Sequence, residues 1–332
     1  MSTKKMKRPR KLWLVLTTII ILSLLAVFII GQFTPVVTAF LLKQPIDMYS
    51  FNPPPDFETI QEKVIVHKDI PYNERGTLLD IYSPKNIDAS VPVILYIHGG
   101  GFIGGRKENT QAYAMTLASA GYVVANINYD LAPRFKYPVQ VMEANQALDY
   151  LRENVGQYGG DINRLFLGSN SAGSHITGQM AVLISNPKFA AQMKIQPSIK
   201  KEQLKGVLLY DGIYNMRTAK SLHLSVIDLY LWSYTGVRDI ESFDRLEGLS
   251  ITDHITSDFP PAFVTVGDAD KLEPQSIELI QSLNKHDVEV DVHLFTDSGA
   301  GLGHDFMMDL DTQPAQQILK NALEFLKRHS NS

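Results

Sequence analysis

The chain has 332 residues, of which 45% are hydrophobic, and it contains no cysteine. Without cysteine it has no disulfide, no thiolate metal site and no cysteine nucleophile. The formal net charge of −4 is uneven, because the first eleven residues carry six basic groups whereas the remainder carries 25 basic and 35 acidic residues. An acidic body of this kind is poorly suited to binding nucleic acid.

The N-terminus combines a basic head with a long apolar run. The head, residues 1–11, contains Lys4, Lys5, Lys7, Arg8, Arg10 and Lys11. The run that follows, Leu12 to Ile30, is uncharged and long enough to cross a bilayer as a helix, which takes roughly 20 residues. Because basic flanks stay in the cytoplasm, we expect a single-pass membrane anchor over residues 12–33, with the rest of the chain extracytoplasmic.

The alternative is a cleavable signal peptide that releases a secreted protein. Its apolar core would be only about 7–15 residues long, which is shorter than the run in this chain. Residues 34–60 are expected to form an extended linker, because "FNPPPDF" (Phe51 to Phe57) contains consecutive prolines and proline disfavours helix. Residues 61–330 are then expected to fold as one large domain.

Strand-like and helix-like segments alternate along this domain. Strands are expected over Glu62–Ile70, Thr77–Pro84, Val91–Ile97, Tyr122–Tyr129, Arg164–Leu167, Lys205–Tyr210, Ala262–Gly267 and Val288–Phe295. Helices are expected near Thr110–Ala120, Pro138–Tyr158, Ala172–Ile184, Pro274–His286 and Pro314–Arg328. This succession predicts an α/β fold with an antiparallel start and a mostly parallel central sheet flanked by helices.

Two long segments interrupt the alternation, near residues 186–204 and 213–258. The stretch Ser221 to Gly236 in the second is apolar on more than one side, as a helix packed over a site would be. Long connections at one end of a sheet are common places for binding sites. We therefore expect these insertions to form a small cap.

The stretch "LGSNSAGS" (Leu167 to Ser174) joins a predicted strand to a predicted helix. A sharp strand-to-helix turn exposes a serine hydroxyl and directs the helix N-terminus at it, which makes Ser171 a candidate nucleophile. In the usual G-x-S-x-G turn both flanking positions are glycine; here Gly173 is present, but Ser169 replaces the first glycine. Serine in a turn is more often a cap or turn residue, so the interpretation depends on three further motifs.

The first of these motifs is "HGGGF" (His98 to Phe102), directly after a predicted strand. Its glycines let the backbone approach a ligand and present N–H groups to a developing oxyanion. The second is "VGDADKL" (Val266 to Leu272), in which Asp268 or Asp270 could orient a histidine. The third is "GLGHDF" (Gly301 to Phe306), which places His304 in a glycine-rich loop after the last strand. Serine, aspartate and histidine follow one another in the chain order of α/β-hydrolases.

At these residues the chain resembles the α/β-hydrolase superfamily, and more narrowly the hormone-sensitive-lipase-type and related bacterial carboxylesterases. The resemblance extends from about Val64 to Phe325. It rests on "LDIYSP" (Leu79 to Pro84), "HGGGF", "YDLAP" (Tyr129 to Pro133), "YGGDINRLFLGSNSAG" (Tyr158 to Gly173), "GDADKL" and "GHDF". It implies an α/β-hydrolase fold with a small cap, here preceded by one transmembrane helix.

The resemblance also assigns roles to residues. It implies that Ser171 is the nucleophile and His304 the general base. The family pattern G-x-x-D-x-L matches Gly267, Asp270 and Leu272, so Asp270 is implied as the acid, with Asp268 in reserve. The N–H groups of Gly100, Gly101 and Ala172 are implied as the oxyanion hole.

The chain departs from this family at two positions of the turn. The family usually has G-D-S-A-G, where this chain has Ser169, Asn170, Ser171, Ala172 and Gly173. The first change bears on the strain of the turn. The loss of the acid at Asn170 bears on how the groups around the site are oriented.

These motifs predict a membrane-anchored serine carboxylic-ester hydrolase that works through an acyl-enzyme. We expect a small-molecule ester as substrate, the lipid bilayer as a partner of the N-terminal helix, and no cofactor, metal or nucleic acid. Other hypotheses stay open: an amidase or peptidase on the same fold, a deacetylase of cell-surface glycans, and a non-catalytic anchored binding protein.

Overall fold

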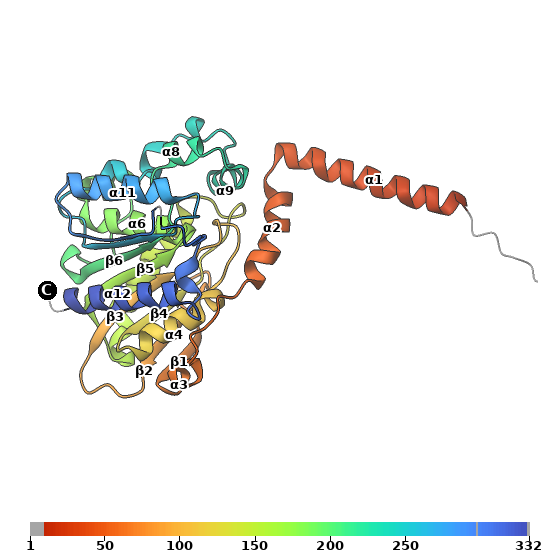
Figure 1. Ribbon diagram of the computed structural model, residues 1–332. Helices are drawn as coiled ribbons and strands as arrows, with labels where there is room; N and C mark the ends of the chain where they lie inside the picture. The colour runs from red at the N-terminus through yellow and green to blue at the C-terminus, as the bar shows by residue number, and fades with distance from the viewer. Residues whose placement is uncertain (1–9, 297, 331–332) are drawn as a thin grey trace, which may run out of the picture.

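The structure is a computed structural model that describes residues 10–296 and 298–330. Residues 1–9, which hold most of the predicted basic head, lie outside the described residues. Figure 1 shows an α/β body from which one long helix, α1 (Arg10–Phe33), projects. Within the described part of the chain there is one candidate membrane span, Trp13–Phe33, and none of it is buried against the body.

An eight-stranded sheet forms the centre of the body, in the order β1-β2-β4-β3-β5-β6-β7-β8. The strands are β1 (Val64–Pro71), β2 (Leu78–Pro84), β3 (Val91–Ile97), β4 (Val123–Ile127), β5 (Gly160–Asn170), β6 (Leu204–Tyr210), β7 (Ala262–Val266) and β8 (Val290–Leu294). β2 pairs antiparallel with both β1 and β4, and every other neighbouring pair is parallel. The predicted mostly parallel α/β sheet with an antiparallel start is confirmed.

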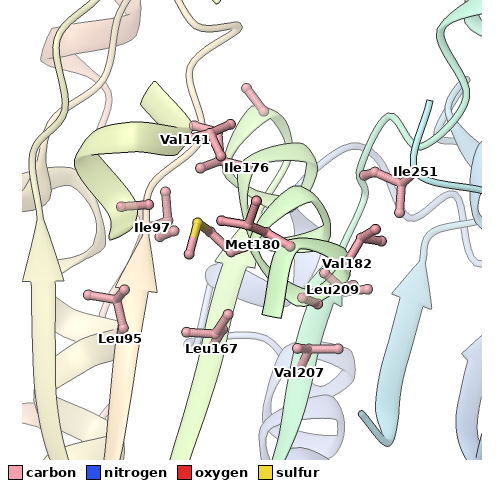
Figure 2. Close-up of a cluster of buried hydrophobic side chains, with 14 of the residues drawn as sticks. Leu95, Ile97, Val141, Leu167, Ile176, Met180, Val182, Val207, Leu209 and Ile251 are labelled. Atoms are coloured by element: carbon pink, nitrogen blue, oxygen red, sulfur yellow. The ribbon is translucent and has the colours of Figure 1, made fainter. Parts of the chain in front are cut away.

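Helices cover both faces of this sheet, as a parallel sheet requires. The helices after α1 are α2 (Val36–Met48), α3 (Phe57–Glu62), α4 (Gln111–Ser119), α5 (Val139–Asn154), α6 (Ala172–Ser185), α7 (Pro187–Met193), α8 (Met216–Ser221), α9 (Ser225–Thr235), α10 (Leu246–Leu249), α11 (Glu273–Lys285) and α12 (Gln313–His329). Successive residues of β3 alternate between two cores: Leu95 and Ile97 pack in the core beneath α5, α6 and α11, whereas Ile94 and Tyr96 pack in the core beneath α4 and α12. Figure 2 shows part of the first core.

Residues 34–60 are largely helical, so the expectation of an extended linker is wrong. Helix α2 occupies much of this segment and contains Pro45, while α3 begins at Phe57. Within this segment only residues 34–35 and residues 49–56, which include the consecutive prolines, lie outside the two helices. A proline removes one N–H donor and crowds the preceding turn, but tertiary packing can outweigh that local cost.

Helix α2 packs tightly against the body, which accounts for its stability. Ala39 is buried, and Leu42 and Ile46 pack against the core beneath α6. The Asp47 side chain accepts a hydrogen bond from the N–H of Gly105 at 2.8 Å. Asn109 in turn donates to the Asp47 carbonyl oxygen at 3.2 Å. These contacts make α2 part of the body rather than a flexible connection.

The two insertions differ in what they cover. The first, residues 186–204, contains α7 and lines a surface depression with Asp149 and Arg152 of α5. The second, residues 213–258, contains α8, α9 and α10. Helix α9 contacts α2, and the two elements lie on the same side of the body (Figure 1).

Candidate active site

Ser171 stands at the junction of β5 and α6. Its backbone adopts φ 51° and ψ −122°, a strained conformation for a residue other than glycine. The Ser171 N–H donates to the carbonyl oxygen of Tyr210 at 2.8 Å, which ties the turn to the end of β6. The strand-to-helix turn predicted from the sequence is therefore present, and β5 extends directly to Asn170.

The two positions that flank this serine have different steric requirements. At Gly173 an added Cβ would lie 2.1 Å from the carbonyl oxygen of Ile97, so no side chain fits there. At Ser169, by contrast, the side chain is fully buried and accommodated. Its Oγ lies 3.1 Å from Ser174 Oγ and 3.2 Å from the carbonyl oxygen of Leu208. The turn thus requires the second glycine, whereas the serine in place of the first one has hydrogen-bond partners.

A hydrogen-bond chain connects the three predicted triad residues. His304 Nε2 lies 2.8 Å from Ser171 Oγ, and His304 Nδ1 lies 2.7 Å from Asp270 Oδ2. The other carboxylate oxygen of Asp270 accepts the N–H of Leu272 at 2.9 Å. The Asp270 side chain is nearly buried, whereas the imidazole of His304 is 39% exposed and faces the cleft.

Asp268, the reserve candidate for the acid, has a different position. It accepts the backbone N–H of Leu302 at 2.6 Å and that of Gly301 at 3.2 Å, together with the Ser298 hydroxyl at 3.0 Å. These bonds lower the pKa of its carboxyl group. Asp268 thus fixes the glycine-rich loop that carries His304, without bonding to the imidazole itself.

Two further carboxyl groups surround His304 and were not singled out from the sequence. Asp211 directly follows β6, is fully buried, and accepts the N–H of Asp305 at 2.6 Å. Burial raises the pKa of its carboxyl group. Asp305 places Oδ2 3.8 Å from His304 Nε2. A polar residue at the end of an otherwise apolar strand, as in "LLYDG" (Leu208 to Gly212), was the available sequence signal for Asp211.

These carboxyl groups determine the basicity of the imidazole. Burial lowers the pKa of His304, but the carboxyl groups of Asp305, Asp270 and Asp211 outweigh burial and raise it to about 10. Asp211, Asp270 and His304 offer ligand atoms within 4.8 Å of one another, a grouping that could in principle hold a cation. Both ring nitrogens of His304 are already directed at Asp270 and Ser171, however, so the grouping fits a proton relay better than a metal site.

Asn170 connects the two loops that meet at the serine. Its Oδ1 accepts the N–H of Gly99 at 3.1 Å, and its Nδ2 donates to Asp305 Oδ1 at 3.0 Å. An aspartate at position 170 could accept the first bond but could not donate the second. It would instead place a carboxylate against that of Asp305. Asparagine at position 170 avoids this repulsion and donates a hydrogen bond to Asp305.

The predicted oxyanion turn follows β3. Gly100 and Gly101 have φ of 114° and 61°, and among the described residues their N–H groups donate to no protein acceptor. A Cβ at Gly101 would lie 2.6 Å from the ring of Tyr230 in α9, so the second insertion packs directly on this turn. Ala172 begins α6, where backbone N–H groups lack intrahelical partners. These are the three N–H groups that the sequence predicts as donors to an oxyanion.

His98 lines the cleft and also supports the glycine turn. Its Nδ1 lies 2.6 Å from the carbonyl oxygen of Gly99, and its ring stacks on Tyr129 with 4.4 Å between centroids. The Tyr129 hydroxyl donates to the His98 carbonyl oxygen at 3.0 Å. Burial lowers the pKa of His98 to about 4, so the ring is neutral at physiological pH.

Ser171 and His304 open into a cleft of about 540 Å³. Part of its wall comes from α9 and the residues before it, and another part comes from α2 and the segment after it. Its apolar side chains include Ile46, Tyr49, Phe51, Phe102, Ile213, Leu224, Val226, Ile227, Tyr230 and Leu272. The wall contributed by residues 46–51 was not predicted, because that segment was taken for a linker.

Comparisons with known proteins agree with this geometry. The BD-FAE family model matches residues 79–283. Esterase LipQ of Mycobacterium tuberculosis is 25% identical over 215 residues, which cover 63% of this chain and 50% of LipQ. Carboxylesterase NlhH of the same organism is 27% identical over 217 residues, which cover 64% of this chain and 66% of NlhH. The chain thus spans between half and two thirds of the length of these relatives.

Solved structures show the same fold. Esterase B from Lactobacillus rhamnosis superposes with a TM-score of 0.73 at 20% identity, covering 83% of this chain and 90% of the esterase. A phosphonate-inhibited form of that enzyme superposes with the same TM-score. At this level of identity the superposition establishes the α/β-hydrolase fold.

The flanking positions of the turn provide a first prediction. Gly173→Ala should lower the free energy of unfolding by about 3 kcal/mol, because the new methyl group overlaps the Ile97 carbonyl oxygen. Ser169→Gly should cost only about 1–2 kcal/mol, since it removes two buried hydrogen-bond contacts without a clash. Denaturant titration of both variants measures this difference. Equal stability of the Gly173→Ala variant and the wild type would contradict the steric argument.

A second prediction separates the two aspartates. Asp270→Asn should lower kcat by about 10⁴-fold, because the histidine loses its orienting charge. Asp268→Asn should lower kcat by less than about tenfold, since it affects the loop and leaves the Asp270 bond to His304 in place. Steady-state ester hydrolysis measures both. A larger loss at Asp268 than at Asp270 would reverse the assignment.

A third prediction concerns pH. A general base must be unprotonated, so activity should rise as the pH passes the pKa of His304, well above the ordinary histidine value. Asp305→Asn removes a nearby negative charge, lowers that pKa, and should move the acidic limb of the kcat/KM profile to lower pH. Asp258→Asn, which removes a surface charge paired with Lys201 at 2.8 Å, is the control and should leave the limb in place. An unmoved limb in the Asp305 variant would show that this carboxylate does not control the base.

Proposed function

We propose that this chain, which belongs to the BD-FAE family of α/β-hydrolases, is a serine carboxylic-ester hydrolase with Ser171, His304 and Asp270 as its triad. One observation carries the proposal: an unbroken hydrogen-bond chain runs from Ser171 Oγ through both nitrogens of His304 to Asp270, at the floor of a cleft. The esterase names of LipQ and NlhH support the same reaction class.

In the first half-reaction Ser171 Oγ attacks the ester carbonyl carbon. The Oγ proton passes to His304 Nε2, which lies 2.8 Å away, while Asp270 stabilises the resulting imidazolium. The carbonyl oxygen becomes an oxyanion and accepts hydrogen bonds from the N–H groups of Gly100, Gly101 and Ala172. One such donor typically contributes ~2.7–4 kcal/mol to stabilising the transition state.

The tetrahedral intermediate then collapses. The bond between the carbonyl carbon and the alcohol oxygen breaks, and the alcohol leaves with the proton from His304. The acyl group remains on Ser171. In the second half-reaction His304 takes a proton from water, the hydroxide oxygen attacks the acyl carbon, and collapse returns the proton to Ser171 and releases the carboxylic acid.

The surrounding groups maintain this arrangement. Asn170 holds the glycine turn and the histidine loop at a fixed separation. Asp268 holds the same loop from its other side. In this proposal residues 61–330 form the catalytic domain, α2 adds one wall, and the second insertion acts as its cap.

The proposal includes a membrane anchor. Helix α1 offers a span of 21 residues with mean hydropathy 2.9 and no buried residue, and six basic residues lie within the first eleven positions of the chain. A helix of that length covers about 31 Å, which matches the hydrocarbon core of a bilayer. The basic flank places the N-terminus in the cytoplasm and the catalytic domain outside.

The test is ester hydrolysis by the full chain in detergent. Wild type should turn over p-nitrophenyl butyrate, and Ser171→Ala should reduce kcat at least about 10³-fold because the nucleophile is lost. Ser221→Ala, at an exposed serine at the end of α8, is the matched control and should retain activity.

Labelling and a second substrate distinguish the outcomes. A fluorophosphonate probe should label the wild type and the Ser221 variant but not the Ser171 variant. Cleavage of an anilide at rates parallel to the ester would favour an amidase. A well-folded wild type that neither turns over esters nor takes the probe would refute the proposal and leave a binding protein.

A further inference from the structure

We propose that the natural substrate is a long-chain acyl ester held in the lipid bilayer. In this proposal the exposed apolar side of α2 and the start of α9 at Val226 rest on the bilayer surface, at the mouth of the cleft. The inference rests on the esterase function and the anchor proposed above, and it adds where the substrate comes from and what class it belongs to.

The connection between α1 and α2 brings the cleft close to the anchor. Only Thr34 and Pro35 separate the two helices. A chain of that length reaches at most about 11 Å from the end of α1 to the start of α2. Helix α2 then lies across the direction of α1 rather than continuing it (Figure 1). A bilayer that holds α1 therefore lies against the side of the body that α2 forms.

Helix α2 is apolar on two sides. Its inner side, Ala39, Leu42 and Ile46, packs against the core. Its outer side follows helical spacing and consists of Val36, Phe40, Leu41, Pro45 and Met48, together with Thr38 and Gln44. The exposed fractions of Phe40, Leu41 and Met48 are 61%, 60% and 76%. An apolar outer side of this kind on a helix next to a membrane span is typical of contact with lipid.

The apolar surface continues to the mouth of the cleft. Tyr49, at the end of α2, is 52% exposed, and Val226, at the start of α9, is 42% exposed. Both line the cleft, one from the α2 side and the other from the α9 side. An acyl chain that leaves the bilayer at this point would pass these apolar side chains on its way to Ser171.

The contact between α1 and the body has the composition of a membrane interface. Arg238 donates to the carbonyl oxygen of Gln32, near the C-terminal end of α1, at 2.7 Å. Its guanidinium also lies over the ring of Trp232, 5.2 Å from the centroid. Tryptophan and arginine are favoured at the level of lipid headgroups, where an apolar stem and a polar tip are both accommodated. This pair marks the level at which the body meets the bilayer.

The experiment compares two esters with the full chain reconstituted in phosphatidylcholine vesicles. p-Nitrophenyl butyrate in the water phase reports the chemistry, and 4-methylumbelliferyl oleate within the vesicles reports access from the bilayer. In Phe40→Glu and Leu41→Glu the ratio of oleate to butyrate hydrolysis should fall at least about fivefold, because a charge lifts the outer side of α2 from the lipid. Butyrate hydrolysis should stay within about twofold of wild type, since neither residue lines the cleft.

The controls are Ile65→Glu and Val292→Glu, which place the same charge at exposed apolar residues of β1 and β8. Their ratio should equal that of wild type. Leu41→Ser, a milder change, provides a second test if a glutamate variant fails to fold, which lost butyrate hydrolysis would reveal.

An unchanged ratio in the α2 variants would overturn the inference. If those variants also lost a dimer in light scattering while the ratio stayed unchanged, a second copy of the chain would be the occupant of this surface, and the inference would again be wrong. Wild type that hydrolyses neither ester would instead refute the esterase function itself, so the two failures are distinguishable.

Discussion

The close approach of α6 to the end of β3 is the constraint on which the site depends. At Gly173 the helix backbone comes so near the Ile97 carbonyl oxygen that not even a methyl group fits. This approach forces the chain through the strained conformation at Ser171 and turns its hydroxyl outward. It also brings Ala172 beside the glycine turn after β3, so the same contact positions both the proposed nucleophile and the proposed oxyanion donors.

A second feature is the concentration of carboxyl groups around one imidazole. Asp270, Asp211 and Asp305 all raise the basicity of His304. Like charges at such short range are tolerated only when some are protonated or hydrogen-bonded. Asn170 serves that purpose, because its amide donates to Asp305 where an aspartate could only repel it. Asparagine in place of the usual aspartate at position 170 therefore fits the negative charge of Asp305.

Much of this arrangement could be predicted from the sequence, because the motifs are local. The serine turn, the glycine turn and the histidine loop each follow a strand, and short apolar runs in a sequence indicate buried strands. The spacing of the residues alone allowed either Asp268 or Asp270 to be the acid. Their different hydrogen-bond partners depend on how the loop that carries His304 is placed. The hydrogen bond between Asn170 and Asp305 joins residues 135 positions apart, which no local pattern could indicate.

The helical character of α2 was missed for a similar reason. Pro45 and the prolines that follow lower the local preference for helix, whereas contacts with the core and with Gly105 stabilise it. Such tertiary contacts have no signature in the segment itself. The wall that residues 46–51 contribute to the cleft was missed with it.

The contact of Tyr230 with Gly101 links substrate size to rate. A Cβ at residue 101 would lie 2.6 Å from the ring, so α9 packs directly on the glycine turn and a shift of one would disturb the other. In the proposed mechanism Gly101 donates to the oxyanion only in the transition state, so an acyl chain long enough to displace α9 would also shift that donor. Interactions made only there appear in kcat, whereas uniform binding appears in KM. A series of acyl lengths would thus be discriminated in turnover as well as in binding, through a side chain that makes no contact with the reacting atoms.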